Sequence, residues 1–174
     1  MQSIGHALSR NNLFWWIVLA ACLTLECIAL YYQYVLDYLP CVLCIHVRMW
    51  LALLIVVSLI MLFAYRNIVM QRLALIISTL IGAALIERSW QLLSTERGWS
   101  FGDCSMQSGL PSWLPIEQWL PWLFKIHEPC GYTPEVPFGL TMAEVLLVIT
   151  TVYFLVALTV TVLSFRQSRF KTAT

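Results

Sequence analysis

Two pairs of cysteines are the residues of this sequence best suited to redox chemistry. Cys41 and Cys44 form a CxxC motif in "PCVLC", and Cys104 and Cys130 lie farther along, on either side of a tryptophan-rich segment. A disulfide within a CxxC motif closes a very short ring and so constrains little of the chain. Such motifs are typical of disulfide exchange, in which a thiolate attacks a disulfide. We therefore interpret Cys41 and Cys44 as a catalytic pair.

Cys104 and Cys130 have two further interpretations. A disulfide between them would close a loop and stabilise the fold by about 3 kcal/mol, which would make the pair structural. A zinc site would use all four cysteines, but zinc motifs usually contain two closely spaced pairs and this chain has one. We expect no metal site, and the structural role stays open at this point.

Arg48 follows Cys44 by one helical turn. If a helix has begun by Cys44, the two side chains share a face and their Cβ atoms lie about 5 to 6 Å apart. A permanent cation there favours the thiolate of Cys44, and it could equally stabilise negative charge on an electron acceptor reduced at that sulfur. The alternative is that Arg48 snorkels to the lipid headgroups from near a helix end.

Glu26 is an ionisable residue inside an apolar stretch. Such residues usually face the interior of a helix bundle and find a partner, for which Arg48 is the obvious candidate. We favour this pairing, with a proton-handling role as the alternative, and we keep Glu26 as a candidate cofactor-binding residue. Cys22 and Cys27 lie about 140° apart around a helix, and we interpret both as small packing residues.

The composition places these residues in a membrane protein. The 174 residues are 60% hydrophobic and 11% charged, and the mean hydropathy is +0.80, unlike the composition of a soluble domain. The formal net charge is +1, and no run of Lys or Arg could follow a phosphate backbone. We therefore expect membrane lipid as a partner and no nucleic acid.

Four apolar stretches are long enough to cross a bilayer, which takes about 20 helical residues. They are predicted at residues 13–34, 41–65, 68–90 and 140–165. The connections between the first three are short, which favours antiparallel neighbours. We predict an all-α membrane protein, a four-transmembrane-helix antiparallel bundle that forms a single domain over residues 1–174.

The first stretch has a rival interpretation as a signal peptide. Arg10, the apolar run and "LAAC" at residues 19–22 resemble the start of a lipoprotein. Hydrophobicity continues unbroken past Cys22 as far as Tyr32, with no polar start of a mature chain. We therefore expect a membrane span and no cleavage.

Basic residues predict the orientation of the bundle. One side of the predicted topology carries Arg10, Arg66, Arg72, Arg166, Arg169 and Lys171. Short loops rich in Lys and Arg stay in the cytoplasm, so both termini are expected there. Cys41, Cys44 and a long loop of about residues 94–139 then face outward.

The outer loop contains "PSWLPIEQWLPWLFKI" at residues 111–126. Tryptophan and aliphatic residues interleaved with a few polar ones suit the headgroup boundary, where an indole ring is buried and its N–H stays wet. We predict a short amphipathic helix parallel to the membrane. The alternative is a partly buried turn over the bundle, because the prolines limit any helix to short pieces.

Taken together, these motifs resemble those of a known family. "LECIALYYQ" in the first stretch, "PCVLCIHVR" at the start of the second and the Trp-Leu-Pro segment between Cys104 and Cys130 are similar to disulfide bond formation protein B, the DsbB family of bacterial inner-membrane, quinone-dependent thiol oxidases. The resemblance covers nearly the whole chain. A CxxC motif alone is weak evidence, but the trailing arginine and the loop make it specific.

The resemblance implies a role for each outer cysteine. Cys104 and Cys130 would form a disulfide that a periplasmic, thioredoxin-fold dithiol oxidase of the DsbA type attacks at Cys104. Cys130 would then engage Cys41, and Cys44 would donate electrons to a membrane quinone, either ubiquinone or menaquinone. Arg48 matches the family arginine near the quinone. Because quinone is lipid soluble, Cys44 is expected where the apolar region begins.

Parts of the chain depart from the family pattern, and other functions were weighed. "LIERSWQLL" at the end of the third stretch matches the family only loosely, so the resemblance gives no quinone contact to Arg88 or Gln91. Electrons could instead run outward from a cytosolic reductant, but only Cys22 lies anywhere near the cytoplasmic half. A non-enzymatic alternative is a membrane assembly or metal-binding module whose cysteines are staples or ligands.

Overall fold

The computed structural model describes residues 12–64, 66–99, 119–124, 126, 135–136 and 139–171. Cys41, Cys44, Arg48 and Glu26 fall within these ranges. Cys104 and Cys130 lie outside them, so the predictions for these two cysteines are not addressed by the structure.

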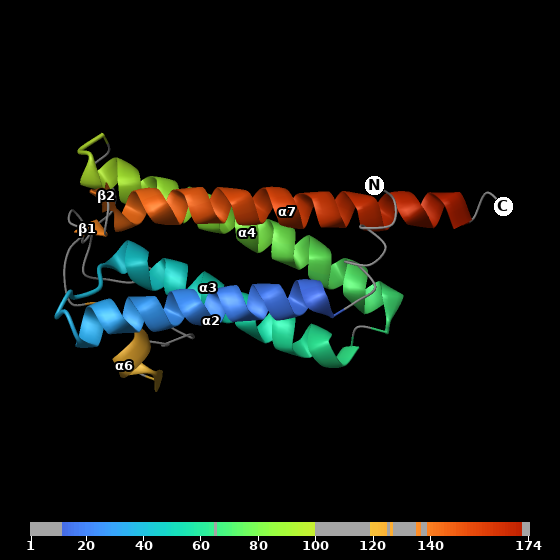
Figure 1. Cartoon of the computed structure of the whole chain (residues 1–174), viewed down its shortest axis with the longest axis horizontal. Coiled ribbons are helices and arrows are strands. Elements are labelled where there is room, and N and C mark those ends of the chain that lie inside the picture. Colours follow the sequence, from blue (N-terminus) through green and yellow to red (C-terminus); the bar gives the residue numbers. More distant parts are fainter. Residues whose placement is uncertain are drawn as a thin grey trace.

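Four long helices form the described part of the chain. They are α2 (Leu13–Tyr34), α3 (Val42–Ala64), α4 (Ile68–Glu96) and α7 (Met142–Lys171). Each contains a segment that is long and apolar enough to cross a membrane. The helices run antiparallel, and each packs against its neighbour in this order (Figure 1). The predicted four-helix membrane bundle is confirmed.

The helix bounds follow the apolar stretches closely except at the C-terminal ends of α4 and α7. Helix α7 was expected to end near residue 165 but continues to Lys171. The first helix has the predicted bounds, and α3 and α7 begin within two residues of theirs. Helix α4 was expected to end near residue 90 but continues to Glu96. Its polar residues bond along the same helix, Arg88 Nη1 to Gln91 Oε1 at 3.0 Å and Gln91 Nε2 to Glu87 Oε1 at 3.2 Å. Polar residues end an apolar span, but they do not end a helix.

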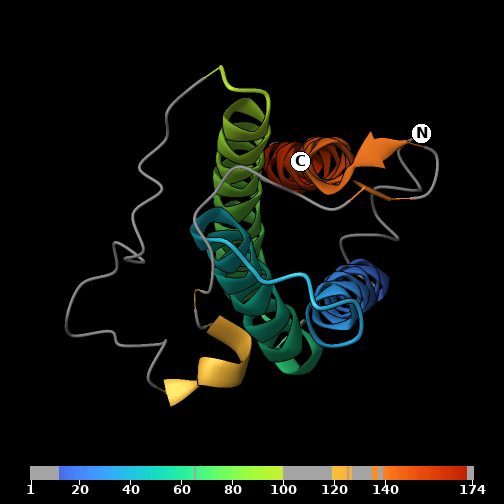
Figure 2. The ribbon, with the colours of Figure 1, turned by 90° about the vertical axis from the view of Figure 1, so that its left-hand side faces the viewer.

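The end of the bundle that holds the CxxC motif carries additional small elements. Helix α6 (Pro121–Phe124) is a single turn that contacts α3, and Figure 2 shows it beside that helix. Strand β1 (Glu135–Val136) pairs antiparallel with β2 (Leu140–Thr141), and Gly139 adopts a positive φ of 71° between them. The sequence did not predict this short hairpin.

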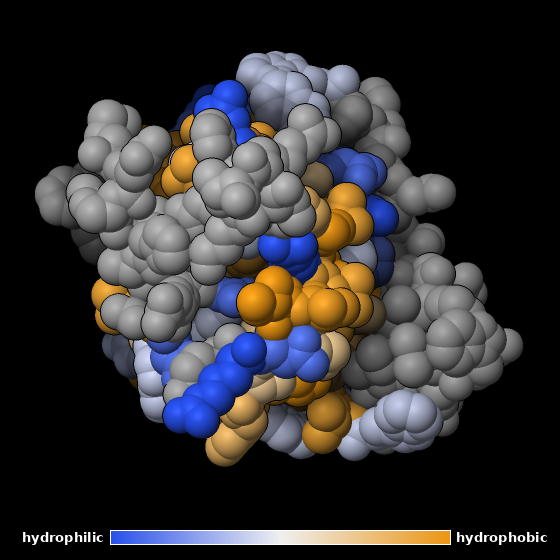
Figure 3. Space-filling model, turned by 90° about the vertical axis from the view of Figure 1, so that its right-hand side faces the viewer, coloured by the Kyte–Doolittle hydropathy of each residue, from blue (hydrophilic) through white to orange (hydrophobic). Residues whose placement is uncertain are grey.

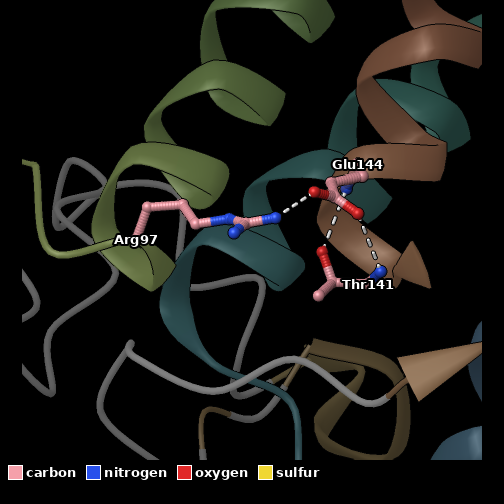
Figure 4. Close-up of polar contacts among 3 residues, drawn as sticks. All are labelled: Arg97, Thr141 and Glu144. Carbon is pink, nitrogen blue, oxygen red and sulfur yellow. Dashed lines mark hydrogen bonds and ion pairs between the residues drawn. The ribbon is translucent and has the colours of Figure 1, made fainter. Parts of the chain in front are cut away.

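Helix α7 is fixed at its start by a capping box. Thr141 Oγ1 accepts a hydrogen bond from the backbone N–H of Glu144 at 3.4 Å, and Glu144 Oε2 accepts one from the N–H of Thr141 at 3.1 Å. The reciprocal pair satisfies two N–H groups at the helix N-terminus. The other carboxylate oxygen of Glu144 forms an ion pair with Arg97 at the end of α4 (Figure 4). The start of α7 is thereby tied to the end of α4.

Neutral hydrogen bonds join α4 and α7 along their length. Ser78 Oγ lies 2.6 Å from Tyr153 Oη, Thr79 Oγ1 lies 2.9 Å from Thr161 Oγ1, and Thr150 Oγ1 donates to Ser89 Oγ at 3.4 Å. Gly82 allows a close approach, since a Cβ atom at this position would lie 3.2 Å from Tyr153 Cε1. Small residues and interhelical hydroxyl groups are the usual means of packing helices in membranes.

The bundle is apolar on both its inside and its outside. The core contains Trp15, Leu54, Met61, Leu75 and Leu85, all nearly fully buried. Large hydrophobic side chains also cover much of the described outer surface, as lipid contact requires. Figure 3 looks onto the end that holds the α3–α4 turn and shows hydrophilic patches beside apolar ones.

Candidate functional site

Cys41 is the N-cap residue of α3. Its carbonyl oxygen accepts the first helical hydrogen bond, from the N–H of Ile45 at 3.1 Å, and its sulfur accepts one from the N–H of Cys44 at 3.4 Å. A side-chain acceptor for this N–H group is the usual N-cap arrangement. The partial positive charge of a helix N-terminus stabilises negative charge on a sulfur atom placed there.

The two sulfur atoms of the motif lie together. Cys41 Sγ and Cys44 Sγ are 3.0 Å apart. A disulfide bond of about 2.05 Å needs only a small side-chain movement from this position. Cys41 is buried and Cys44 is partly exposed. The pair can therefore cycle between thiols and a disulfide, with Cys44 as the more accessible sulfur.

Apolar residues from two other helices pack around the motif. Leu92 and Leu93 from the last turns of α4 and Ala143 from the first turn of α7 form one cluster with Cys41, and Cys44 packs against it. The ion pair between Arg97 and Glu144 joins the same two helix ends. This surrounding was not predicted, because it depends on which helix ends meet.

Arg48 points into the bundle. Its side chain is 5% exposed, and its guanidinium donates to Gln33 Oε1 at 2.5 Å and to the carbonyl oxygen of Ala29 at 3.0 Å. Its positive charge lies close enough to Cys44 and Cys41 for an electrostatic interaction with both. The buried guanidinium bonds within the protein, and the spacing of Arg48 from Cys44 along α3 places the two side chains on one face of that helix.

Helix α6 is attached to the same arginine. Arg48 Nη1 donates to the carbonyl oxygen of Leu123 at 3.3 Å, and Tyr34 Oη donates to that of Trp122 at 2.5 Å. Phe124 is buried, whereas Trp119 and Trp122 are exposed. The described turn therefore combines one docked side with outward tryptophans, and its placement along a membrane surface stays a prediction.

Glu26 does not form the ion pair with Arg48 that we predicted. The side chain is 8% exposed, and neither carboxylate oxygen has a hydrogen-bond partner among the described residues. The prediction is wrong because the Arg48 guanidinium donates to Gln33, Ala29 and Leu123 instead. Glu26 is nevertheless within electrostatic range of Arg48.

The other residues singled out in the sequence fall into two groups. Cys22 is buried in the main core cluster, but Cys27 is exposed on the outside of the bundle, so the prediction of a packing role is wrong for Cys27. Five positions along a helix turn the side chain far enough to leave the core.

Arg88 and Gln91 bond to each other on α4.

Gln33 is the site residue that sequence reasoning missed. It is buried, and it lies on the same face of α2 as Glu26 and Ala29, because these positions are separated by three and four residues. A buried glutamine near the C-terminal end of an apolar helix requires a hydrogen-bond partner. That requirement was the available signal, although the sequence alone could not name Arg48 as the partner.

Comparisons with known proteins show which family this chain belongs to. The family model described as disulfide bond formation protein DsbB matches residues 11–160. Disulfide bond formation protein B of Haemophilus influenzae is 31% identical over 159 residues, which cover 90% of this chain and 89% of that protein. The protein of the same name from Shewanella amazonensis is 31% identical over 89% of this chain and 92% of its own length. Disulfide bond formation protein B 2 of Pseudomonas aeruginosa is 30% identical over 76% and 80%. The chain therefore belongs to the DsbB family of disulfide bond formation proteins, and is a membrane oxidoreductase that forms disulfides.

Proposed function

We propose that this chain is a membrane thiol:quinone oxidoreductase. It reoxidises a periplasmic DsbA-type dithiol oxidase by disulfide exchange and passes the electrons to a membrane quinone, ubiquinone or menaquinone. The observation that carries the proposal is the arrangement of Cys41 and Cys44, 3.0 Å apart, at the start of an apolar helix whose next turn holds the buried Arg48. In this arrangement the two sulfur atoms lie at the end of an apolar helix, where a lipid-soluble acceptor can reach them.

The residues beside Cys44 fit a quinone. A quinone ring presents carbonyl oxygens that accept hydrogen bonds, and the buried guanidinium of Arg48 can donate to one of them. A quinone held there by Arg48 would serve as the acceptor of two electrons and two protons. Cys44 is partly exposed, so its sulfur is accessible, and the apolar outer surface of α2 and α3 suits an isoprenoid tail. We assign Arg48 and Cys44 to quinone contact, with Glu26 as a further candidate.

The proposed relay uses the four outer cysteines in turn. The partner thiolate attacks Cys104 of a Cys104–Cys130 disulfide, and the released Cys130 attacks Cys41. This second exchange breaks the Cys41–Cys44 bond and leaves Cys44 as a thiolate. When the partner disulfide closes, Cys104 returns to Cys130 and frees Cys41. The electron pair of Cys41 and Cys44 then goes to the quinone, and their disulfide forms again.

The orientation follows from the distribution of basic residues. Arg66 and Arg166 are exposed near the end of the bundle opposite to Cys41. Positively charged ends of membrane helices remain in the cytoplasm. We propose an inner-membrane protein with cytoplasmic termini, whose CxxC motif and long loop face the periplasm.

The experiment that tests this function is anaerobic mixing of the purified protein with a reduced DsbA-type partner and a water-soluble ubiquinone analogue. Quinone reduction is followed by its ultraviolet absorbance. The wild type is expected to turn over many times, and Cys44→Ser and Cys104→Ser are expected to lose turnover because each interrupts the relay. Cys27→Ser is the matched control, since Cys27 lies on the outside of the bundle, and it is expected to keep full activity.

Full turnover in Cys44→Ser or Cys104→Ser would overturn the relay. Failure of the wild type to reduce the quinone analogue would overturn quinone as the acceptor. The thiol content of the wild type separates the other functions: a structural pair stays oxidised when the partner is added, and a metal-binding site releases metal when its thiols are modified.

A further inference from the structure

We propose that Glu26 delivers a proton to the quinone that is reduced at Cys44. This inference rests on the proposed function and assigns a second chemical role in the same site. The sulfur pair supplies electrons from α3, and the carboxyl group supplies a proton from the facing helix α2. Three observations support this role: the burial of Glu26, the lack of hydrogen-bond partners for its carboxylate oxygens, and its position one turn from the contact of α2 with Arg48.

The surroundings of Glu26 favour a neutral acid with a transferable proton. Its side chain is 8% exposed, and both carboxylate oxygens are buried without a hydrogen-bond partner among the described residues. A buried carboxylate that accepts no hydrogen bond is costly, and a neutral carboxylic acid is far less so. Native structures rarely leave such a group unsatisfied, and a catalytic role is one of the known reasons when they do. Ionisable residues inside membrane helices usually serve ligands or proton transfer.

The position of Glu26 joins it to the electron-transfer site. On α2, Glu26 precedes Ala29 by three residues, which is about 4.5 Å along the helix axis and on the same face. The carbonyl oxygen of Ala29 accepts a hydrogen bond from Arg48 Nη2 at 3.0 Å. Arg48 in turn lies one helical turn after Cys44 on α3. Arg48, which would hold a quinone beside Cys44, therefore contacts α2 one turn away from Glu26.

The chemistry balances with this assignment. The thiols of Cys41 and Cys44 lose two electrons and two protons as their S–S bond forms, and the quinone gains two of each to become a quinol. Glu26 gives one proton to a quinone oxygen as the electron pair arrives. The resulting carboxylate is stabilised by the nearby charge of Arg48. It then recovers a proton from those released by the thiols, so Glu26 is unchanged after each turnover.

Few other titratable groups surround Glu26 in the described structure. Arg48 acts on it from α3, and Cys22 interacts with it from its own helix. Cys44 and Cys41 act on Arg48 and so affect Glu26 indirectly. Arg48 keeps its charge across the usual pH range, which leaves Glu26 as the described carboxyl group that can supply the proton at this depth.

The kinetic test compares Glu26→Gln with Glu87→Gln in the full-length protein. Glutamine keeps the size of the side chain and removes the proton. We expect Glu26→Gln to slow quinone reduction by about 10²-fold, the usual contribution of a general acid. Disulfide exchange with the reduced partner, measured without quinone, is expected to stay unchanged. Glu87 is an exposed carboxyl bonded to Gln91 on α4, and its substitution is expected to leave both rates unchanged.

A second measurement does not depend on turnover. Infrared spectra of the quinone-free protein are expected to show the carbonyl band of a protonated carboxylic acid at neutral pH, shifted by exchange into heavy water. Glu26→Gln removes this band and Glu87→Gln keeps it. Glu26→Asp keeps the acid, so it is expected to retain the band and part of the rate, and it covers the case in which Glu26→Gln does not fold.

The outcomes separate this inference from the proposed function. An active wild type with unchanged quinone reduction in Glu26→Gln would overturn the proton role and leave the thiol:quinone activity standing. Loss of the infrared band in Glu87→Gln but not in Glu26→Gln would overturn it as well. An inactive wild type would instead overturn the proposed function, and the infrared result would still decide whether Glu26 holds a proton.

Discussion

The α2–α3 contact and the α4–α7 contact both bury polar side chains, but these side chains differ in charge and in hydrogen bonding. Between α4 and α7 the buried groups are neutral hydroxyls, and they bond in pairs such as Ser78 with Tyr153. Between α2 and α3 the buried groups are Arg48, Gln33 and Glu26, two of which carry ionisable side chains. Arg48 donates to three acceptors, whereas the Glu26 oxygens have no hydrogen-bond partner among the described residues.

This difference distinguishes a helix contact that serves packing from one that holds groups able to react. Paired hydroxyl groups stabilise a helix contact in a membrane and hold no charge that a reaction could use. A buried charge and an unpartnered acid cost stability and are kept where they bind or react. We therefore propose that the half of the α2–α3 contact nearest Cys44 is the reactive half of this bundle.

The largest effect is expected for Arg48→Ala. The substitution removes the buried cation beside Cys44 and should lower kcat/KM for quinone by about 10²-fold, as loss of a stabilising donor does in other enzymes. Disulfide exchange with the partner should be intact. The measurement is steady-state quinone reduction at varied quinone concentration.

Arg88→Ala is the matched control for Arg48, because Arg88 bonds to Gln91 on its own helix. It is expected to match the wild type. An unchanged apparent affinity for quinone in Arg48→Ala would show that the charge behind Cys44 has no part in quinone binding, and the contrast between the two helix contacts would lose its basis.

A smaller effect is expected for Gln33→Ala. Gln33 is a positioning residue, since its Oε1 atom holds Arg48 Nη1 at 2.5 Å. Loss of a hydrogen bond to a charged group, about 1.5 kcal/mol, corresponds to a rise in KM for quinone of about tenfold, with kcat less affected. Gln33→Glu keeps an acceptor for the guanidinium and should restore most of the affinity. Equal defects in both variants would mean that Gln33 acts by packing alone.

The smallest effect is expected in the other helix contact. Tyr153→Phe removes the hydrogen bond with Ser78, and such bonds contribute about 0.6 kcal/mol to the stability of membrane helices. The thermal midpoint of the detergent-solubilised protein should fall slightly, with kcat and KM for quinone unchanged. A marked change in quinone kinetics would contradict the assignment of the α4–α7 contact to packing.

The sequence predicted those features that depend on local periodicity. Backbone groups in lipid must bond within the helix, so an apolar run interrupted only by Glu26 predicted α2 with its observed bounds. One helical turn between Cys44 and Arg48 placed both on one face of α3. The charged residues of α4 misled the prediction of its end, because Glu87 and Arg88 bond within the helix.

The features that the sequence did not predict depend on tertiary contacts. From the sequence, several groups could have accepted hydrogen bonds from Arg48. The positions of α2 and α6 in the bundle bring Gln33, Ala29 and Leu123 within hydrogen-bond distance, and Glu26 receives no such bond. The apolar surroundings of Cys41 depend on the meeting of the ends of α4 and α7. Neither outcome is encoded in the spacing of residues along one helix.

The most direct test of the central claim isolates the Cys41–Cys44 pair from the rest of the relay. In a variant with Cys104→Ser and Cys130→Ser, the pair is reduced, the reductant is removed anaerobically, and a ubiquinone analogue is added in the absence of any partner. Trapping with a mass-tagged thiol reagent should then show that Cys41 and Cys44 become oxidised as one quinol forms per pair. If both thiols remain reduced while the quinone is present in excess, Cys44 is not the residue that delivers electrons to the membrane.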